Sequence, residues 1–284
     1  LAFWRLSSGW RALGWAVAAA AAGWTALLTQ SRGGLVGLLL AVTYLGAVGA
    51  WRSRFEKRLH LGRVLVGWTL LAILGVGAFM LLPGEARERY LTLLNPATDY
   101  NVTAQREGRL AVWQRGLDTL SERPWGVGVG AYQVAEMAKS GYMRAAHNSL
   151  LEISVELGVV GGVLYLLLWL RAWRVLGQLM DRAVAPAAAR RGRRARAPPV
   201  PVAREAEKIE EHHDPATAHV PEHWAIHAQH LRASVAGLLG AGFFISQAYS
   251  LLAFTLLAVI AGLESRYLPR AVALRVAPGA RVRR

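Results

Sequence analysis

Long apolar runs alternate with short polar and basic breaks along most of the chain. Most of these runs are close to the ~20 residues with which an α-helix crosses a bilayer. The last run is longer than one untilted span and contains the polar stretch 246–250, so we interpret it as two short helices. The pattern predicts an all-α protein, a polytopic transmembrane helical bundle of about six spans. The apolar runs cover residues 10–29, 35–51, 64–82, 147–170 and 231–263.

The polar segments divide the expected bundle into regions. Residues 83–146 carry eight Lys or Arg against seven Asp or Glu and contain the turn pairs Asn95-Pro96 and Arg123-Pro124, which favours one large periplasmic loop. Residues 171–230 are basic and His-rich, and we expect them to be a flexible cytoplasmic loop. In chain order the expected regions are spans 1–3 in 1–82, the periplasmic loop with short helices in 83–146, a fourth span in 147–170, the cytoplasmic loop in 171–230, two short transmembrane helices in 231–264 and a basic cytoplasmic tail in 265–284.

The charge distribution orients these regions. The chain carries a net charge of +15 although 54% of its residues are hydrophobic, and the positive charges lie in the breaks between apolar runs. Basic loops face the cytoplasm in membrane proteins, which accounts for the charge without a nucleic-acid partner. The chain contains no cysteine, which excludes disulfides and thiolate metal sites.

Arg32 lies in a short turn between two apolar runs, within Gln30-Ser31-Arg32-Gly33-Gly34. A charged side chain at such a place either serves a function or extends to the aqueous interface, and the position alone leaves both interpretations open. The two glycines permit close approach of a bulky ligand to the backbone. A guanidinium group binds phosphate oxygens through two parallel N–H groups, so the turn is a candidate oxyanion site.

His147 and Asn148 mark the entry to the fourth apolar run. Asn148, Glu152 and Glu156 are spaced by four residues and therefore share one helical face. Carboxylates on an otherwise apolar helix are expected to face a protein interior or an aqueous cleft. A plainer interpretation has His147 and Asn148 as a helix start and Glu152 as an interfacial charge, whereas Glu156, two turns further in, favours a functional role.

Two further patterns carry less chemical information. Arg109 and Trp113 lie four residues apart in a stretch of helical pattern, which fits a short amphipathic helix with either a functional or a merely solvated arginine. Gly126-Val127-Gly128-Val129-Gly130 lacks the spacing of a dinucleotide-binding loop, and we expect a close-packed turn. The histidines of 212–230 do not follow the zinc-protease spacing, and we expect no bound metal there.

Three local patterns, in this order, resemble the O-antigen ligase and O-antigen polymerase superfamily, a group of bacterial lipid-linked glycan transferases. The resemblance covers about residues 10–170 and 231–264 and corresponds to the C-terminal part of such proteins. The patterns are Ser31-Arg32-Gly33 between two spans, then Gly108-Arg109 with Trp113 and Pro124-Trp125-Gly126-Val127-Gly128 in the periplasmic loop, then Ala146-His147-Asn148-Ser149 with Glu156-Leu157-Gly158 and Gly161 at the next span.

The resemblance implies a metal-independent glycosyltransferase of lipopolysaccharide biosynthesis, a multi-pass protein of the bacterial inner membrane. It would transfer a glycan from undecaprenyl diphosphate to an acceptor hydroxyl at the periplasmic face. Arg32 and Arg109 would match the family's diphosphate-binding arginines. His147 would match its essential histidine, which activates the acceptor hydroxyl or assists the leaving diphosphate. The residues expected to support the site are Ser31, Trp113, Asn148, Glu156 and Tyr249.

The expected partners are a lipid-linked glycan donor, a lipid or glycan acceptor, and membrane lipids, with no nucleic acid and no cofactor. A polymerase with the same chemistry is the first alternative, because the motifs do not specify the acceptor. A non-catalytic subunit of a larger membrane complex is the second, since such proteins usually have ten or more spans and this chain begins at Leu1 beside an apolar run, as a fragment would. A bicarbonate-type transporter is the third, although its charges would follow a path across the membrane and not gather at one face.

Overall fold

The computed structural model describes residues 7–55, 69, 73–92, 94–95, 108–196, 220–246 and 249–268, with the backbone alone for 49–55, 184–196 and 222. The described residues form helices and connecting turns and no strand. In chain order the helices are α2 (Gly9–Leu28), α3 (Arg32–Phe55), α5 (Gly84–Leu91), α7 (Arg109–Glu122), α8 (Tyr132–Ser140), α9 (Ser149–Arg196), α10 (Glu222–Gly242) and α11 (Leu251–Tyr267).

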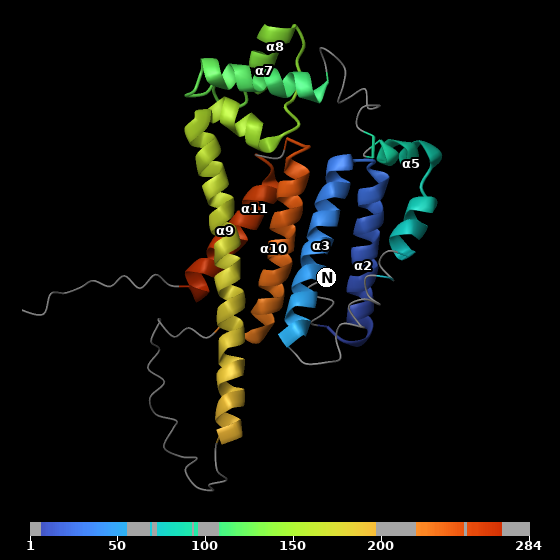
Figure 1. Cartoon of the computed structure of the whole chain (residues 1–284), viewed down its shortest axis with the longest axis vertical. Helices are drawn as coiled ribbons and strands as arrows, with labels where there is room; N and C mark the ends of the chain where they lie inside the picture. Colours follow the sequence, from blue (N-terminus) through green and yellow to red (C-terminus); the bar gives the residue numbers. More distant parts are fainter. Residues whose placement is uncertain are drawn as a thin grey trace, which may run out of the picture.

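Helix α10 lies between α3 and α9 and packs along both (Figure 1). Small residues spaced by four permit the close approach of α10 to α3. A Cβ on Gly37 would lie 2.5 Å from the carbonyl oxygen of Gly237, and one on Gly33 would lie 2.7 Å from Cβ of Phe244. Small residues at this spacing let two helix backbones come into contact. Such contacts hold helices together within a membrane, where burial of apolar side chains contributes little.

The main apolar core joins α9, α10 and α11. It contains Trp169 and Leu176 of α9, Val235 of α10 and Ile260 of α11, all nearly inaccessible to solvent. At this level Arg171 of α9 also forms an ion pair with Glu264 of α11, at 2.6 Å. Helices α9 and α10 therefore pack extensively, and α11 joins them through a smaller contact.

One end of the bundle, which we name the capped end, is covered by α5, α7 and α8 (Figure 1). Helix α7 packs against the beginning of α9, and α8 packs against both α7 and α9. These three helices belong to the segment 83–146 that the sequence predicts to be a periplasmic loop. The capped end is therefore where the chain departs from a simple helix bundle.

Helix α9 differs from the fourth apolar run in two respects. It is interrupted at Gly158, whose φ of 74° and ψ of −178° are not helical, and it continues far beyond residue 170, to Arg196. At the break, the N–H of Val127 bonds to the carbonyl of Val155 and the N–H of Gly128 to that of Glu156. The loop before α8 thus takes the carbonyls that the helix would otherwise use, and residues 149–157 form a separate short arm (Figure 1).

Two described helices are long and apolar enough to cross a bilayer, Gly9–Leu28 and the stretch Ser149–Ala183 of α9, and the apolar part of α3, Arg32–Val48, is shorter. Helix α2 has no buried residue, and α9 exposes a row of valines and leucines over 159–170. Large apolar surfaces of this kind are rare on soluble proteins and suit contact with lipid. The bundle of about six spans stays a prediction.

Parts of the expected organisation lie outside the described residues. Of the apolar run 64–82, the structure describes residue 69 and 73–82, with a helix over 73–80. The expected basic loop after α3, the later part of the cytoplasmic loop and the basic tail fall largely on 56–68, 197–219 and 269–284, which are not described. The last apolar region appears as α10 and α11, with a turn between them, and α10 begins at Glu222 instead of residue 231.

Candidate functional site

Arg32 is the first residue of α3 and lies at the capped end. Ser31 caps this helix, because its hydroxyl oxygen accepts a hydrogen bond of 3.1 Å from the N–H of Gly34. The preceding Gln30 has a φ of 52°, which completes the sharp reversal from α2. The guanidinium of Arg32 donates to the hydroxyl of Thr92 at 2.9 Å. The position of Arg32 at a helix N-terminus adds backbone N–H groups to its charge, and both favour an anion.

Thr92 belongs to a segment held firmly over the α2–α3 turn. Just before it, the hydroxyl of Tyr90 in α5 donates to the carbonyl of Leu27 in α2 at 2.7 Å. Leu82, Ala86 and Tyr90 form a small apolar cluster that packs on Leu27 and Leu35. Arg32 is therefore oriented by a partner that is itself anchored to the bundle.

His147 is exposed and adopts a left-handed backbone conformation, with φ of 47°, which is uncommon for a residue other than glycine. Contacts on both sides hold this conformation. The carbonyl of the preceding Ala146 accepts a 2.7 Å hydrogen bond from the indole N–H of Trp113. The side-chain oxygen of the following Asn148 accepts from the N–H of Leu151 at 3.0 Å and so caps α9. Unusual backbone conformations held by their surroundings are frequent at functional sites.

Two arginines lie close to the imidazole of His147. Although His147 is exposed overall, the surrounding protein removes part of the water from its imidazole. This desolvation lowers the pKa of His147 below its ordinary value, and the charges of Arg109 and Arg144 lower it further. Arg109 begins α7, and Arg144 lies in the turn that leads to His147. The neutral form of the imidazole is therefore favoured near neutral pH, next to a strongly cationic surface.

At the capped end, the start of α3, the start of α9 and the end of α10 meet beside these residues. The hydroxyl of Ser149 at the start of α9 donates to the carbonyl of Ile245 after α10, at 2.8 Å. A Cβ on Gly33 of α3 would lie 3.2 Å from the side chain of Ile245. Arg32 and His147 are one and two residues from these contacts, so the fold brings the first and third sequence motifs to the same end of the bundle. The ring of Trp113 contacts that of Phe243 at 5.4 Å between centroids and joins α7 to the same region.

Glu156 is 3% exposed and its two carboxylate oxygens have different surroundings. Oε1 accepts a 3.1 Å hydrogen bond from the N–H of Tyr132 at the beginning of α8. Oε2 is buried without a hydrogen-bond partner among the described residues. Tyr249, in the turn between α10 and α11, lies near Glu156. Burial, followed by the side-chain interaction with Glu156 and then by the charges of Glu156 and Glu152, raises the pKa of Tyr249. Glu156 therefore ties α8 to the break in α9.

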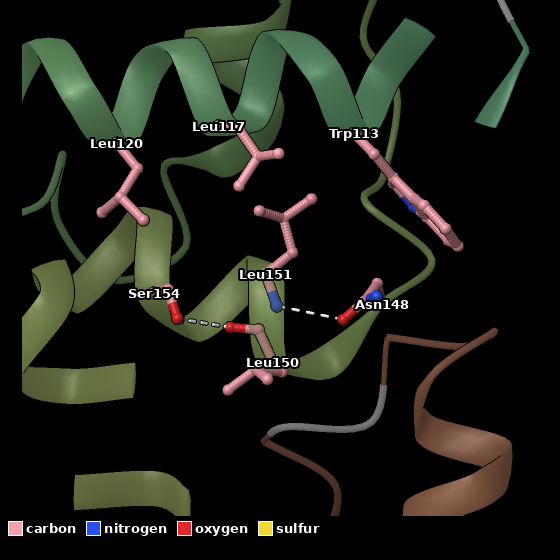
Figure 2. A pocket seen from close by; sticks show the side chains of 7 residues that line it. All are labelled: Trp113, Leu117, Leu120, Asn148, Leu150, Leu151 and Ser154. Atoms are coloured by element: carbon pink, nitrogen blue, oxygen red, sulfur yellow. Dashed lines mark hydrogen bonds between the residues drawn. The ribbon is translucent and has the colours of Figure 1, made fainter. Parts of the chain in front are cut away.

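An apolar cavity of about 270 Å³ lies between α7 and the first arm of α9 (Figure 2). Its two polar side chains make internal hydrogen bonds: Asn148 with the backbone of Leu151, and the hydroxyl of Ser154 with the carbonyl of Leu150 at 2.7 Å. Most of the wall is therefore suited to an apolar ligand group. The lining residues are Trp113, Leu117, Leu120, Asn148, Leu150, Leu151 and Ser154.

The sequence alone did not indicate several of these features. Arg144, Thr92 and Phe243 were not singled out, although Arg144 stands three residues before His147 and its charge could have suggested a role. No group of three potential metal ligands occurs among the described residues, and the expectation of no bound metal at the histidine tract stays a prediction. His212, His213 and His219 lie outside the described residues.

Comparison with known proteins agrees with the sequence motifs. A family model described as O-antigen ligase matches residues 17–166, which is more than half of the chain and contains the segments of Arg32, Arg109 and His147. The match confirms the resemblance that the motifs indicated. No curated protein and no solved structure matches.

Proposed function

This chain belongs to the O-antigen ligase family, and we propose that it transfers a glycan from undecaprenyl diphosphate to an acceptor hydroxyl at the periplasmic face of the bacterial inner membrane. The family acts on lipid-linked glycans and is membrane-associated, in keeping with the two long apolar helices. In this proposal the capped end faces the periplasm, because the basic segments after α3 and within α9 then face the cytoplasm. The chain crosses the membrane several times.

The arginines of the capped end bind the donor diphosphate. Arg32 offers a guanidinium at a helix N-terminus, and Arg109 and Arg144 place two more cations beside His147. When the sugar–phosphate bond breaks, negative charge grows on the diphosphate. Fixed cations stabilise this charge without reorganising, and each such group contributes roughly 10²–10³ in rate. These arginines take the part that a divalent cation plays in many phosphate-cleaving enzymes.

His147 acts as the general base. The acceptor hydroxyl gives its proton to the neutral imidazole, its oxygen bonds to the anomeric carbon, and the bond from that carbon to the diphosphate oxygen breaks, with the electron pair leaving on the diphosphate. A base with a pKa below the working pH is unprotonated and ready to accept this proton. The lowered pKa of His147 suits this role.

In this proposal the apolar cavity receives part of the donor's prenyl chain. Trp113 and Asn148 line it, and these two residues also hold the backbone on either side of His147. Ser31, Asn148 and Glu156 support the site by fixing the backbone, since the first two cap helices and the third anchors α8. Tyr249 lies beside Glu156 and interacts with it.

The observation that carries the proposal is the combination of features around His147. It combines a left-handed backbone, a hydrogen-bonded neighbour on each side, two nearby arginines and an adjacent apolar cavity. A merely structural histidine in a turn would not require this combination. A polymerase would use the same groups, because only the acceptor differs between the two reactions.

Deletion of the gene in its host tests the proposal and separates these two reactions. Surface polysaccharide is resolved on a gel beside the pool of carrier-linked glycan. Loss of attached glycan with accumulation of long carrier-linked polymer indicates a ligase. Accumulation of single carrier-linked repeat units indicates a polymerase. An unchanged profile in a strain without a second copy contradicts the proposal and favours a non-catalytic subunit.

A further inference from the structure

Arg232 of α10 lies far from the capped end and in unusual surroundings. It is ten residues before Gly242, so its Cα is about 15 Å along the helix from the end of α10 that meets His147. Its guanidinium carbon lies 4.2 Å from the ring centroid of Trp173 in α9. Gly177 of the same helix lies beside it, since a Cβ there would be in ordinary van der Waals contact with the guanidinium, 3.4 Å from one of its terminal nitrogens.

Donor groups without acceptors gather at this place. Nε of Arg232 is buried and has no hydrogen-bond partner among the described residues, and the same holds for the hydroxyl of Tyr44 in α3. Tyr44 packs edge-on against the same Trp173, at 5.2 Å between ring centroids. A guanidinium group has five N–H donors and no acceptor, so a site that holds one should contain an acceptor group. The indole face of Trp173 partly stabilises the positive charge, but it does not accept the hydrogen bonds of the guanidinium N–H groups.

The carboxylate of α11 that pairs with α9 is already engaged. Glu264 of α11 pairs with Arg171, and Arg182 donates to the carbonyl of Tyr267 at 3.2 Å. Within the described part of the chain no carboxylate forms an ion pair with Arg232. The described residues thus leave this cluster open to an acceptor group from a bound molecule.

The depth of the guanidinium indicates where that molecule lies. The apolar run of α9 over 157–170 ends at Arg171, and Gly177 is six residues, about 9 Å, further along. The span that is apolar enough to cross a bilayer continues to Ala183. The guanidinium beside Gly177 therefore lies about 9 Å from the end of that span, on the side opposite the capped end and within reach of polar lipid groups. Basic pockets between membrane helices at this level bind anionic lipid head groups.

We infer that Arg232, Tyr44 and Trp173 form a phosphate-binding site between α3, α9 and α10, occupied by the head group of an anionic phospholipid of the cytoplasmic leaflet. The guanidinium donates to the phosphate oxygens while it stacks on the indole, and the hydroxyl of Tyr44 donates a further hydrogen bond. A lipid bound here bridges the three helices away from the capped end. This site needs a membrane position for the bundle but does not depend on glycan transfer.

Binding is tested with the full-length protein in nanodiscs of phosphatidylcholine alone or mixed with phosphatidylglycerol, with retained lipid measured by native mass spectrometry. Arg232→Gln should lower phosphatidylglycerol retention about fivefold or more. Arg174→Gln is the matched control, because Arg174 is exposed, lies on α9 beside Trp173 and has no partner role in the cluster. Equal retention by wild type and Arg232→Gln, or an equal loss in both variants, overturns the inference.

Two further arms identify the ligand and guard against misfolding. Inorganic phosphate added to the phosphatidylcholine nanodiscs should not protect Arg232 from modification by phenylglyoxal, whereas phosphatidylglycerol should; the reverse result would assign free phosphate and overturn the lipid part of the inference. If Arg232→Gln fails to fold, Tyr44→Phe is measured in its place. It keeps the ring on Trp173 and removes only the hydroxyl, so unchanged lipid retention in that variant contradicts the site.

Discussion

The indole N–H of Trp113 donates a 2.7 Å hydrogen bond to the carbonyl oxygen of Ala146, and so ties α7 to the residue that precedes His147. The two residues are 33 positions apart in the chain. Their contact connects the second sequence motif to the third. It also places Arg109, one helical turn from Trp113, on the side of α7 from which its charge reaches the imidazole.

Trp113→Phe should weaken this connection while keeping the ring contact with Phe243. We expect kcat for glycan transfer to fall about tenfold, because a hydrogen bond of about 1 kcal/mol is lost and the base is less well positioned. Steady-state kinetics with purified protein and lipid-linked donor measure this, with the donor KM changing less than kcat. A variant with wild-type kcat would show that the Trp113–Ala146 contact does not orient the base.

The pH dependence of transfer should reflect the ionisation of His147. The base must be neutral, so the rate rises with pH through its pKa, and the lowered pKa puts the midpoint below the ordinary value of 6.5. Arg144→Gln removes a nearby positive charge, which raises the pKa of His147 and moves the midpoint to higher pH. Arg123→Gln is the control, because the exposed Arg123 lies at the far end of α7. A midpoint that moves to lower pH in Arg144→Gln, or that moves equally in both variants, contradicts the assignment.

Arg32→Ala should reduce transfer by roughly 10²–10³, the usual effect of removing one group that stabilises developing charge. Thr92→Val separates the charge of Arg32 from the orientation of its side chain, because it removes the hydrogen-bond partner of the guanidinium, at 2.9 Å, and leaves the charge. Its effect should be much smaller. The rates of both variants are compared at saturating donor, with membrane insertion checked by protease accessibility. Equal rates for Arg32→Ala and wild type would remove Arg32 from the site.

Gly126→Ala should destabilise the fold more than Gly128→Ala. Both glycines have positive φ, 94° and 107°, so alanine is strained at either position by about 1 kcal/mol or more. Only at Gly126 would the new Cβ also collide with backbone, 2.3 Å from the carbonyl oxygen of Glu156. We expect a further loss of about 1–3 kcal/mol in the free energy of unfolding. Thermal unfolding in detergent measures both variants, and equal losses would show that this packing is not tight.

Much of the candidate site was accessible from the sequence because its parts are local. A polar turn between apolar runs located Ser31 and Arg32, and a polar pair before an apolar run located His147 and Asn148. The proposed helix start at this pair is where Asn148 caps α9. A turn is present at 126–130, with three glycines at positive φ, and of these Gly126 is the one that is closely packed, as expected.

The break at Gly158 could not be read from the local pattern. A single glycine within an apolar helical run is usually tolerated, and here the break depends on a loop some thirty residues earlier whose N–H groups take the helix carbonyls. For the same reason the shared helical face of Asn148 and Glu156 did not reveal that Glu156 anchors α8. The contact of Gly33 and Gly37 with α10 did leave a signal, the spacing of small residues by four, which the sequence interpretation did not use.

The most direct test of the account is transfer of glycan from undecaprenyl diphosphate by the purified protein, with wild type, His147→Ala and the control Arg123→Ala compared in one assay. We predict that wild type and Arg123→Ala transfer at similar rates and that His147→Ala is slower by about 10²–10⁴, the contribution expected of a general base. Transfer by His147→Ala at the wild-type rate would contradict the account.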